Sequence, residues 1–393
     1  MERLVDPEDV HVRRAGTQEL LISPANLPTA PALPPDLDTP CLVIDLDVVE
    51  ANARRMAEAM AELGMALRPH VKTHKSVALA KIQIASGAIG VTVGTLGEAE
   101  VMAGGGIADI LIAYPLWASG SKARRLRALL DQPDLRLAVG VDSEAGALTL
   151  AAATRGSSRP LRVLIEIDPG YGRTGVTPDQ ADELASAAAG AGLEVVGAFT
   201  HGGHGYAGPD AVGDAAADEV AALAAAAESM RAAGIEATVL SAGSSPTAVH
   251  AARAPVTELR PGTYLIGDRQ QVFLGASPPD GVAMAVAATV VSDAAAGQIV
   301  INAGAKSLTK DVPAYLAGHG FLPAYPAGIV ERVSDYHGQV RFPDGAPRPR
   351  LGEMVAVVPN HACPVIDLFD SFVATRGGEI IGVWPVDARG RSG

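Results

Sequence analysis

The regular alternation of short β-branched runs with helical segments between Pro40 and Asp268 restricts the fold of this chain more than any other feature. Parallel strands joined by helical crossovers produce such a pattern. The helix predicted over 48–64 contains strong helix formers and stops at Gly64, and the one predicted over 214–233 is mostly alanine. The predicted strands cover residues 40–46, 66–72, 90–95, 109–115, 135–142, 162–168, 193–201, 238–243 and 258–266.

These candidate strands exceed by one the number in a TIM-type (β/α)8 barrel, so one of them lies outside the barrel. An open, doubly wound sheet is the alternative. It is disfavoured because no complete GxGxxG fingerprint follows the first strand. We therefore predict a (β/α)8 barrel within residues 36–270.

The chain changes character on both sides of this region. Residues 1–35 have weak periodicity and end in a proline-rich stretch, which predicts an N-terminal arm. Beyond about residue 275 the helical period fades, and a mainly β domain is predicted over 271–393. Its clearest strand-like runs are 283–294, 297–302, 353–359 and 379–386.

Charge and cysteine content exclude several classes of function. The chain has 44 acidic and 31 basic residues and a net charge of −13, which disfavours nucleic acid as a partner. Two cysteines are too few for a secreted disulfide framework. We find no signal-peptide pattern and no apolar run of membrane length. We expect a cytoplasmic protein with no membrane partner.

A crowded basic motif ends the predicted strand 66–72. In RPHVKTHK, Lys72 is flanked by Arg68, His70 and Lys75. A lysine amine surrounded by other cations, at the end of a barrel strand, is a candidate for Schiff-base chemistry. The structural alternative is a basic turn at the surface.

Glycine-rich loops follow three further strands. The loop 241–247, SAGSSPT, opens a predicted helix and has small residues and hydroxyls that suit a phosphate. The loop 168–175 carries Arg173, a donor for a phenolate or carboxylate. The loop 201–206, HGGHGY, leaves room for a planar ligand. A plain helix cap, a solvated arginine and a glycine hinge are the respective structural alternatives.

A possible metal pair lies in the β domain. In PNHACP, His361 and Cys363 are two residues apart, so in an extended strand both side chains share a face. Imidazole and thiolate suit Zn²⁺, and two protein ligands leave positions open for water or substrate. The structural alternative is a buried free cysteine beside a capped histidine.

With RPHVKTHK, DPGYGRTGV, HGGHGY, AGSSPT, ELRPGTYLIGD and PNHACP in this order, the chain resembles a fold-type III pyridoxal 5′-phosphate (PLP) family. This is the family of D-serine dehydratase and D-threonine aldolase, which is related to alanine racemase. The resemblance runs from about Asp38 to the C-terminus. It implies an alanine racemase-like barrel followed by a β domain, with 66–72 as the first barrel strand, 258–266 as the eighth and 40–46 outside. Asn302 and Asp335 depart from residues common in the family.

The resemblance also implies roles for individual residues. Lys72 would carry PLP and act as the catalytic base, Arg173 would lie near the 3′-oxygen, and His201 near the pyridine ring. His361 and Cys363 would hold a divalent metal, with zinc expected first and manganese or magnesium as alternatives. The other implied cofactor contacts are Tyr206, Gly243, Ser244, Ser245, Thr247, Arg260 and Tyr264.

The implied function is a PLP- and metal-dependent lyase, active as a homodimer on small β-hydroxy D-amino acids. The dehydratase branch yields a 2-oxo acid and ammonia, and the aldolase branch yields glycine and an aldehyde. Cys363 favours the dehydratase, because aldolase relatives can use aspartate there. A racemase needs no metal, and non-catalytic PLP-binding proteins typically consist of the barrel alone. The metal pair and the β domain argue against both of these.

Overall fold

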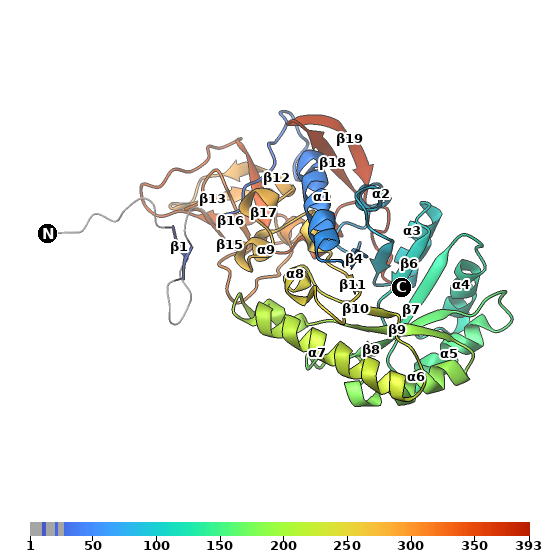
Figure 1. Ribbon diagram of the computed structural model, residues 1–393. Coiled ribbons are helices and arrows are strands. Elements are labelled where there is room, and N and C mark those ends of the chain that lie inside the picture. Colours follow the sequence, from blue (N-terminus) through green and yellow to red (C-terminus); the bar gives the residue numbers. More distant parts are fainter. Residues whose placement is uncertain (1–9, 13–19, 23–26) are drawn as a thin grey trace. The chain divides into compact units, whose positions relative to one another are not determined.

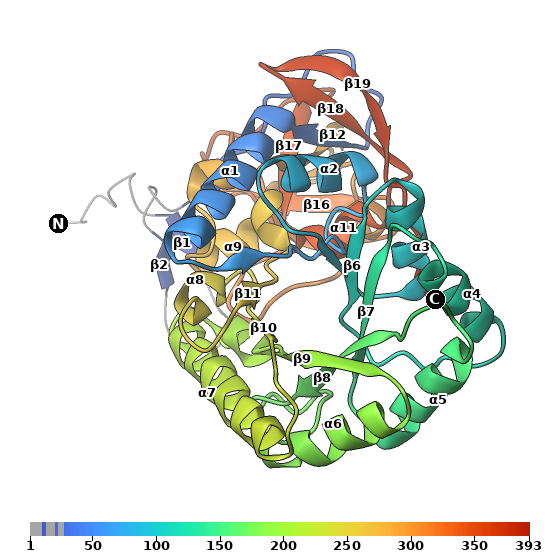
Figure 2. The ribbon, with the colours of Figure 1, turned by 45° about the vertical axis from the view of Figure 1, so that its right-hand side comes forward.

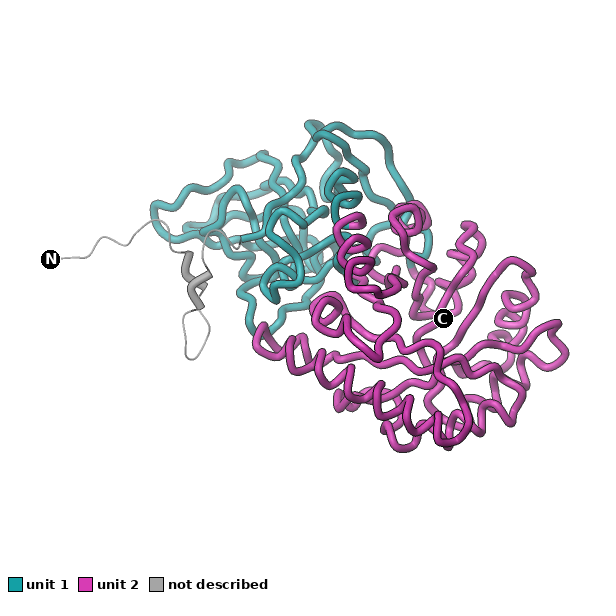
Figure 3. The backbone as a smooth tube through the Cα atoms, in the orientation of Figure 1, with its two compact units in different colours: residues 1–52, 263–389 teal, residues 53–262, 390–393 magenta. Residues whose placement is uncertain are grey.

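The computed structural model describes residues 10–12, 20–22 and 27–393, and the chain forms two compact units (Figure 3). The barrel unit comprises Ala53–Gly262 and Gly390–Gly393, and the sheet unit comprises the chain up to Asn52 and Thr263–Arg389. Of the predicted arm, the structure describes residues 27–35 and the antiparallel pair β1 (Val10–Val12) and β2 (Leu20–Ile22), and the rest lies outside the described residues. No helix in the described part of the chain is both long enough and apolar enough to cross a membrane.

The barrel unit contains a curled sheet of eight parallel strands, in the order β4-β11-β10-β9-β8-β7-β6-β5. Helices α4 to α7 lie around the outside of this sheet (Figure 2). Each strand falls within its predicted range. The bounds are β4 Ala66–Leu67, β5 Val91–Val93, β6 Asp109–Ile112, β7 Arg136–Val141, β8 Arg162–Ile167, β9 Glu194–Thr200, β10 Val239–Ala242 and β11 Glu258–Leu259.

The helices follow the strands as the sequence pattern indicates (Figure 1). The two helices predicted most clearly are α1, Leu46–Glu62, and α7, Ala211–Ala232. The others in this region are α2 Val77–Ala85, α3 Leu96–Gly104, α4 Gly120–Leu130, α5 Glu144–Thr154, α6 Ala181–Gly190 and α8 Ala248–Ala251.

The first and last strands of this order are joined just beyond β4. His70 forms a parallel bridge with Thr92 of β5. The Val71 N–H donates to the Thr92 carbonyl at 2.9 Å, and the Thr92 N–H donates to the Pro69 carbonyl at 2.8 Å. Regular pairing of β4 stops after two residues, at the approach to Pro69, which has no N–H to contribute. The predicted strand 66–72 is therefore a short ladder followed by a single bridge.

A buried ion-pair network anchors this first strand. Arg68 Nε lies 3.0 Å from Glu258 Oε2 on β11, and Arg68 Nη1 lies 2.5 Å from Asp109 Oδ1 on β6. The two carboxylates raise the pKa of Arg68 despite its burial. The network continues from Glu258 to the Ser241 hydroxyl (2.6 Å) and on to Arg260 (2.6 Å). It therefore links residues that follow or belong to four barrel strands.

The sheet unit contains a nine-stranded sheet in the order β13-β16-β15-β14-β17-β12-β3-β18-β19. β3 (Cys41–Asp45), the strand expected outside the barrel, pairs antiparallel with β12 and parallel with β18. The other strands are β12 Met284–Ser292, β13 Gln298–Ile301, β14 Gly320–Phe321, β15 Ile329–Val333, β16 Gly338–Arg341, β17 Met354–Pro359, β18 Ser371–Arg376 and β19 Glu379–Pro385. The short helices are α9 Arg269–Phe273, α10 Ala305–Leu308 and α11 Ala362–Ile366.

Asn302, which departs from the family pattern, has a structural role in this sheet unit. Its side-chain Nδ2 donates to the Thr39 carbonyl and hydroxyl oxygens, each at 3.0 Å. Its Oδ1 accepts from the Thr289 N–H at 2.8 Å. An ionised aspartate would accept the bond from the Thr289 N–H but could not donate the two bonds to Thr39, so the amide suits this position.

We expect Arg68→Met to lower the free energy of unfolding by about 3 kcal/mol, because it leaves the buried Glu258 carboxylate without its ion pair. Urea denaturation followed by circular dichroism measures the loss. Arg341→Met is the control, since its pair with Glu331 is exposed and should contribute about 1 kcal/mol or less. Equal losses in the two variants would contradict the anchoring role of Arg68.

Candidate active site

The basic residues around Lys72 have partners of their own. Arg68 is held by the network described above, and Lys75 Nζ lies 3.5 Å from Glu98 Oε1. His74 is fully buried. Its Nδ1 accepts from the Ser76 N–H at 3.1 Å, so its Nε2 carries the proton and donates to Gln83 Oε1 at 3.1 Å. Burial lowers the pKa of His74 to about 4. Lys72 itself is exposed beyond the end of the strand.

Side chains from four strand ends, three of them cationic, gather near Lys72. Burial, together with the charges of Lys72, Arg260 and Arg173, holds the pKa values of His70 and His201 well below the usual range. Lys72 follows β4, Arg173 follows β8, His201 follows β9 and Arg260 follows β11. The structure therefore brings these predicted residues together at the carboxyl ends of the strands, where parallel barrels bind their ligands. Cations gathered in a chain of net charge −13 mark a site for an anion.

The loop that carries Arg173 is tightly organised. Asp168 accepts two N–H groups of its own loop, at 3.0 Å each, and Val176 returns to bridge Ile167 of β8. The Arg173 guanidinium lies 5.7 Å from the centre of the Tyr171 ring, and that ring meets His201 edge-on at 6.1 Å.

Glu166 is a site residue that the sequence analysis missed. It is buried, its Oε1 accepts from the Thr174 hydroxyl at 2.6 Å, and burial raises its pKa while the charge of Arg173 opposes that rise. The available signal was a single acidic residue among the four apolar residues of Val163–Ile167 in β8.

The predicted phosphate loop is a buried turn lined with hydroxyl groups. Gly243 has a φ of +86°, and a Cβ there would lie 2.8 Å from Leu259 Cδ1, so only glycine fits. Thr247 Oγ1 accepts from the Ser244 N–H at 2.8 Å, and Ser245 Oγ accepts from the Gly262 N–H at 3.2 Å. The helix expected after this turn, α8, has only four residues. The hydroxyls and the glycine, rather than a helix dipole, therefore define the turn.

The remaining predicted cofactor contacts have different surroundings. The Arg260 guanidinium donates to the Ser241 hydroxyl and the Thr200 carbonyl, and lies 5.3 Å from the centre of the Phe199 ring. Tyr206 lies in a short turn, Gly203–Ala207. This turn is close to the predicted phosphate loop, as a Cβ at Gly205 would lie 3.1 Å from the Thr247 side chain. Tyr264 is buried and belongs to the sheet unit.

The predicted metal pair is brought together, but not on a strand. β17 ends at Pro359, His361 caps the start of α11, and Cys363 lies in the first turn of that helix. The expectation of an extended segment was therefore wrong, because the chain turns into a helix directly after His361. Burial lowers the pKa of His361, but the negative charges of Cys363, Asp311 and Asp268 outweigh it and raise that pKa to about 11. The negative charges that stabilise a proton on His361 would also attract a metal cation.

Two aspartates that the sequence analysis missed hold this pair. Asp311 Oδ2 lies 2.7 Å from His361 Nδ1 and orients the imidazole. Asp268 is fully buried, and its two oxygens accept the N–H groups of Gln271 in α9 and Ala362 in α11, at 2.8 Å each. Burial raises the pKa of Asp268 to about 6. Within the described ranges, no group of three or more histidine, cysteine or acidic side chains is arranged to hold a metal ion.

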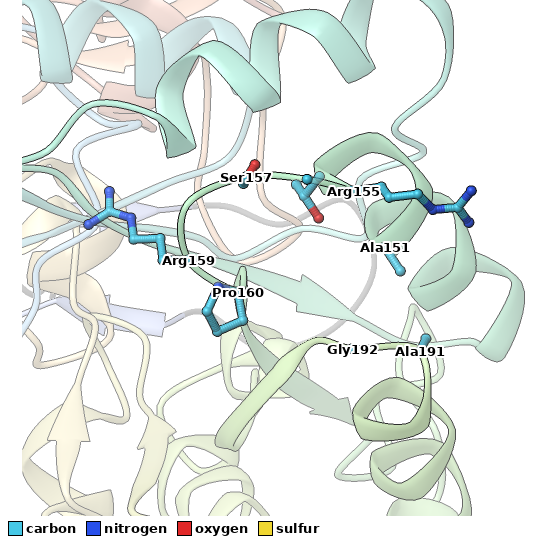
Figure 4. Close-up of a pocket in the computed structure, with 9 residues that line it drawn as sticks. Ala151, Arg155, Ser157, Arg159, Pro160, Ala191 and Gly192 are labelled. Atoms are coloured by element: carbon cyan, nitrogen blue, oxygen red, sulfur yellow. The ribbon is translucent and has the colours of Figure 1, made fainter.

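A hollow of about 280 Å³ in the barrel unit lies away from these residues (Figure 4). It is lined by residues 151, 154–157, 159–160 and 191–192, which precede β8 and β9. It therefore lies at the opposite ends of the strands from Lys72. Arg159 beside it donates to the Leu130 carbonyl at 2.9 Å, at the C-terminus of α4, which is a structural contact.

Comparison with known proteins gives matches over both regions. Residues 44–270 match the alanine racemase N-terminal domain, and residues 283–375 match a serine dehydratase domain. The chain is 35% identical over 370 residues to D-threo-3-hydroxyaspartate dehydratase of Delftia sp. HT23, covering 88% of this chain and 97% of that protein.

Solved structures show the same similarity. D-threonine aldolase of Filomicrobium marinum matches with a TM-score of 0.83 and 32% identity, over 92% of this chain and 99% of that one. A metal-free form of D-threo-3-hydroxyaspartate dehydratase with a cysteine replaced by alanine matches with a TM-score of 0.79 and 33% identity, over 89% and 97%. Another structure of that enzyme has alanine in place of a histidine two positions earlier.

We expect the free energy of unfolding to fall as the pH drops from 6.5 towards 4. In this range His74 is protonated in the unfolded chain but stays neutral in the folded chain, where burial lowers its pKa to about 4. This residue contributes a slope of up to about 1.4 kcal/mol per pH unit in that window. His74→Gln should have a shallower slope there and an unchanged slope above pH 7. Urea denaturation across the pH series measures both proteins, and identical slopes would contradict the assignment. His70 and His201 are present in both, so the difference isolates His74.

Proposed function

The chain belongs to the fold-type III family of PLP-dependent lyases that includes D-serine dehydratase and D-threonine aldolase, and from this premise we propose that it dehydrates β-hydroxy D-amino acids. The products would be a 2-oxo acid and ammonia. The observation that carries this proposal is the pair of His361 and Cys363 at the start of α11, held between Asp268 and Asp311.

The barrel unit has the donors that PLP requires. The charges of Lys72, Arg173 and Arg260 suit an anionic ligand, and the turn at Gly243 leaves no room for a side chain. Bound PLP supplies an electron sink for negative charge developing at the substrate Cα. We assign Lys72 as the attachment point of the cofactor and the base for the α-proton, because its exposed amine stands at the end of the first barrel strand.

Other residues of the barrel unit would position the cofactor. Arg173 would donate to the phenolate oxygen, and the hydroxyls of Ser244, Ser245 and Thr247 lie on the turn that would hold the phosphate. His201 is neutral, because burial and the nearby cations keep its pKa low, so its ring can pack against the pyridine without adding charge.

The sheet unit has donors for a divalent ion. Imidazole and thiolate are the ligands that zinc prefers, and the surrounding carboxylates favour a cation. A bound divalent ion supplies polarisation of a hydroxyl oxygen, which makes that hydroxyl a better leaving group. Solved variants of the dehydratase relative replace a histidine and, in a second structure, the cysteine two positions after it; the cysteine variant is in the metal-free form. His361 and Cys363 of this chain have the same spacing.

An aldolase is the second candidate. It is favoured by the similarity to D-threonine aldolase of Filomicrobium marinum, which covers 92% of this chain with a TM-score of 0.83. The same residues would bind the cofactor and the metal, but the Cα–Cβ bond would break and yield glycine and an aldehyde. The thiolate at Cys363 makes the dehydratase our first choice.

Product analysis with D-threonine separates these candidates. We expect the protein loaded with PLP and Zn²⁺ to form 2-oxobutyrate and ammonia from D-threonine and nothing from L-threonine. Lys72→Ala should reduce the rate at least about 10²-fold, because it removes the α-base. Glycine and acetaldehyde as products would establish the aldolase instead, and full activity of Lys72→Ala would overturn the assignment of the lysine.

We expect Cys363→Ala to weaken Zn²⁺ binding at least about tenfold, because it removes one of the two proposed protein ligands. Replacing a residue that only hydrogen-bonds to a metal ligand already lowers metal affinity by about tenfold, so the loss of a ligand itself should be at least as large. Metal content after dialysis against a weak chelator is the measurement. Cys41→Ala is the matched control, since Cys41 is the only other cysteine and lies in β3. Unchanged zinc content in Cys363→Ala would refute the metal site. PLP absorbance should be normal in both variants.

A further inference from the structure

A single buried carboxylate connects the two loops that we assign to the cofactor ring and to its phosphate. Glu219 lies on α7, which packs against β9 and β10 (Figure 2), and it is fully buried. Its Oε1 accepts the Gly202 N–H at 2.7 Å and the Gly243 N–H at 3.2 Å. Gly202 follows His201 at the end of β9, and Gly243 opens the hydroxyl-lined turn at the end of β10.

The packing around this carboxylate is close. A Cβ at Gly202 would lie 3.0 Å from both Cγ and Cδ of Glu219, so a side chain there would displace the carboxylate. Burying a carboxylate on an otherwise alanine-rich helix is costly unless hydrogen bonds compensate. Here the two glycine N–H groups, the Thr247 hydroxyl and the charge of Arg260 provide that compensation. The arrangement makes the spacing of the two loops depend on one oxygen atom.

We propose that Glu219 is a positioning residue that fixes the distance between the His201 loop and the Gly243–Thr247 turn, and thereby sets the affinity for PLP. This inference rests on the proposed function, because it takes the two loops as the ring and phosphate sites. A ligand that contacts both loops needs the correct spacing between them. A ligand that contacts only the ring loop does not.

Comparing PLP with pyridoxal, which lacks the phosphate, tests this inference. The dissociation constant of each is measured from the absorbance of the lysine-bound form. The ratio of the pyridoxal constant to the PLP constant gives the gain in affinity that the phosphate confers. We expect Glu219→Ala to shrink this ratio about tenfold, because two buried N–H groups lose their acceptor and the loops lose their register. Glu219→Gln keeps Oε1 as an acceptor for both N–H groups, so its ratio should stay within about threefold of the original.

Further variants separate positioning from folding. Glu219→Asp keeps the charge but withdraws the oxygen by one methylene, so its ratio should also fall, even if the alanine variant fails to fold. Glu228→Ala, an exposed carboxylate on the same helix, is the matched control and should leave the ratio unchanged. An equal loss of affinity for PLP and pyridoxal would overturn the inference and assign Glu219 a general structural role. An unaltered ratio in Glu219→Asp would also overturn it.

Failure of the inference and failure of the proposed function give different results. If the original protein forms no lysine-bound species with PLP or pyridoxal, the assignment of Lys72 fails, and Glu219 has no cofactor to position. If the original protein binds both and the ratio does not respond to Glu219→Ala or Glu219→Asp, only the role of Glu219 is refuted.

Discussion

The barrel unit depends on the join between its first strand and the strands on either side. β4 provides only two residues of regular pairing, so the backbone of residues 69–71 and the side chain of Arg68 make the connection to β5, β6 and β11. Lys72 follows this join directly. The position of Lys72 is therefore determined by the same contacts that close the sheet, and the other strand ends are arranged around it.

Buried carboxylates repeatedly act as connectors in this chain. Glu258, Glu219 and Asp268 each bind two groups on different segments: Arg68 and Ser241, two glycine N–H groups, and the first turns of α9 and α11. Aromatic residues make up only 4% of the chain, and alanine covers much of the helix surface. Small side chains pack without directional preference, so ionised oxygens that accept N–H groups supply the directional constraint around both sites.

Periodicity predicted the strands well, because each barrel strand is buried on both faces and bounded by turn residues. It did not reveal that β4 would be so short, since pairing there depends on Pro69. Motifs identified the candidate cofactor and metal residues, but they assigned no role to Glu166, Glu219, Asp268 or Asp311. These four contact side chains or backbone N–H groups of other segments, and such pairings exist only in the folded chain. The turn at His361 was missed for the same reason.

The division of the sheet unit into two chain segments imposes an order on folding. β3 is among the first strands to be synthesised, yet its partners β12 and β18 follow only after the entire barrel segment. During synthesis the barrel segment can fold before the partners of β3 exist. The apolar residues of β3 and its unpaired backbone groups are then exposed, which makes the strand prone to pair with other chains. The slow step of assembly would be the late insertion of β3 between β12 and β18, a contact between distant parts of the sequence. A circular permutant that places residues 27–45 after Arg389, with the break just before α1, would make this pairing local.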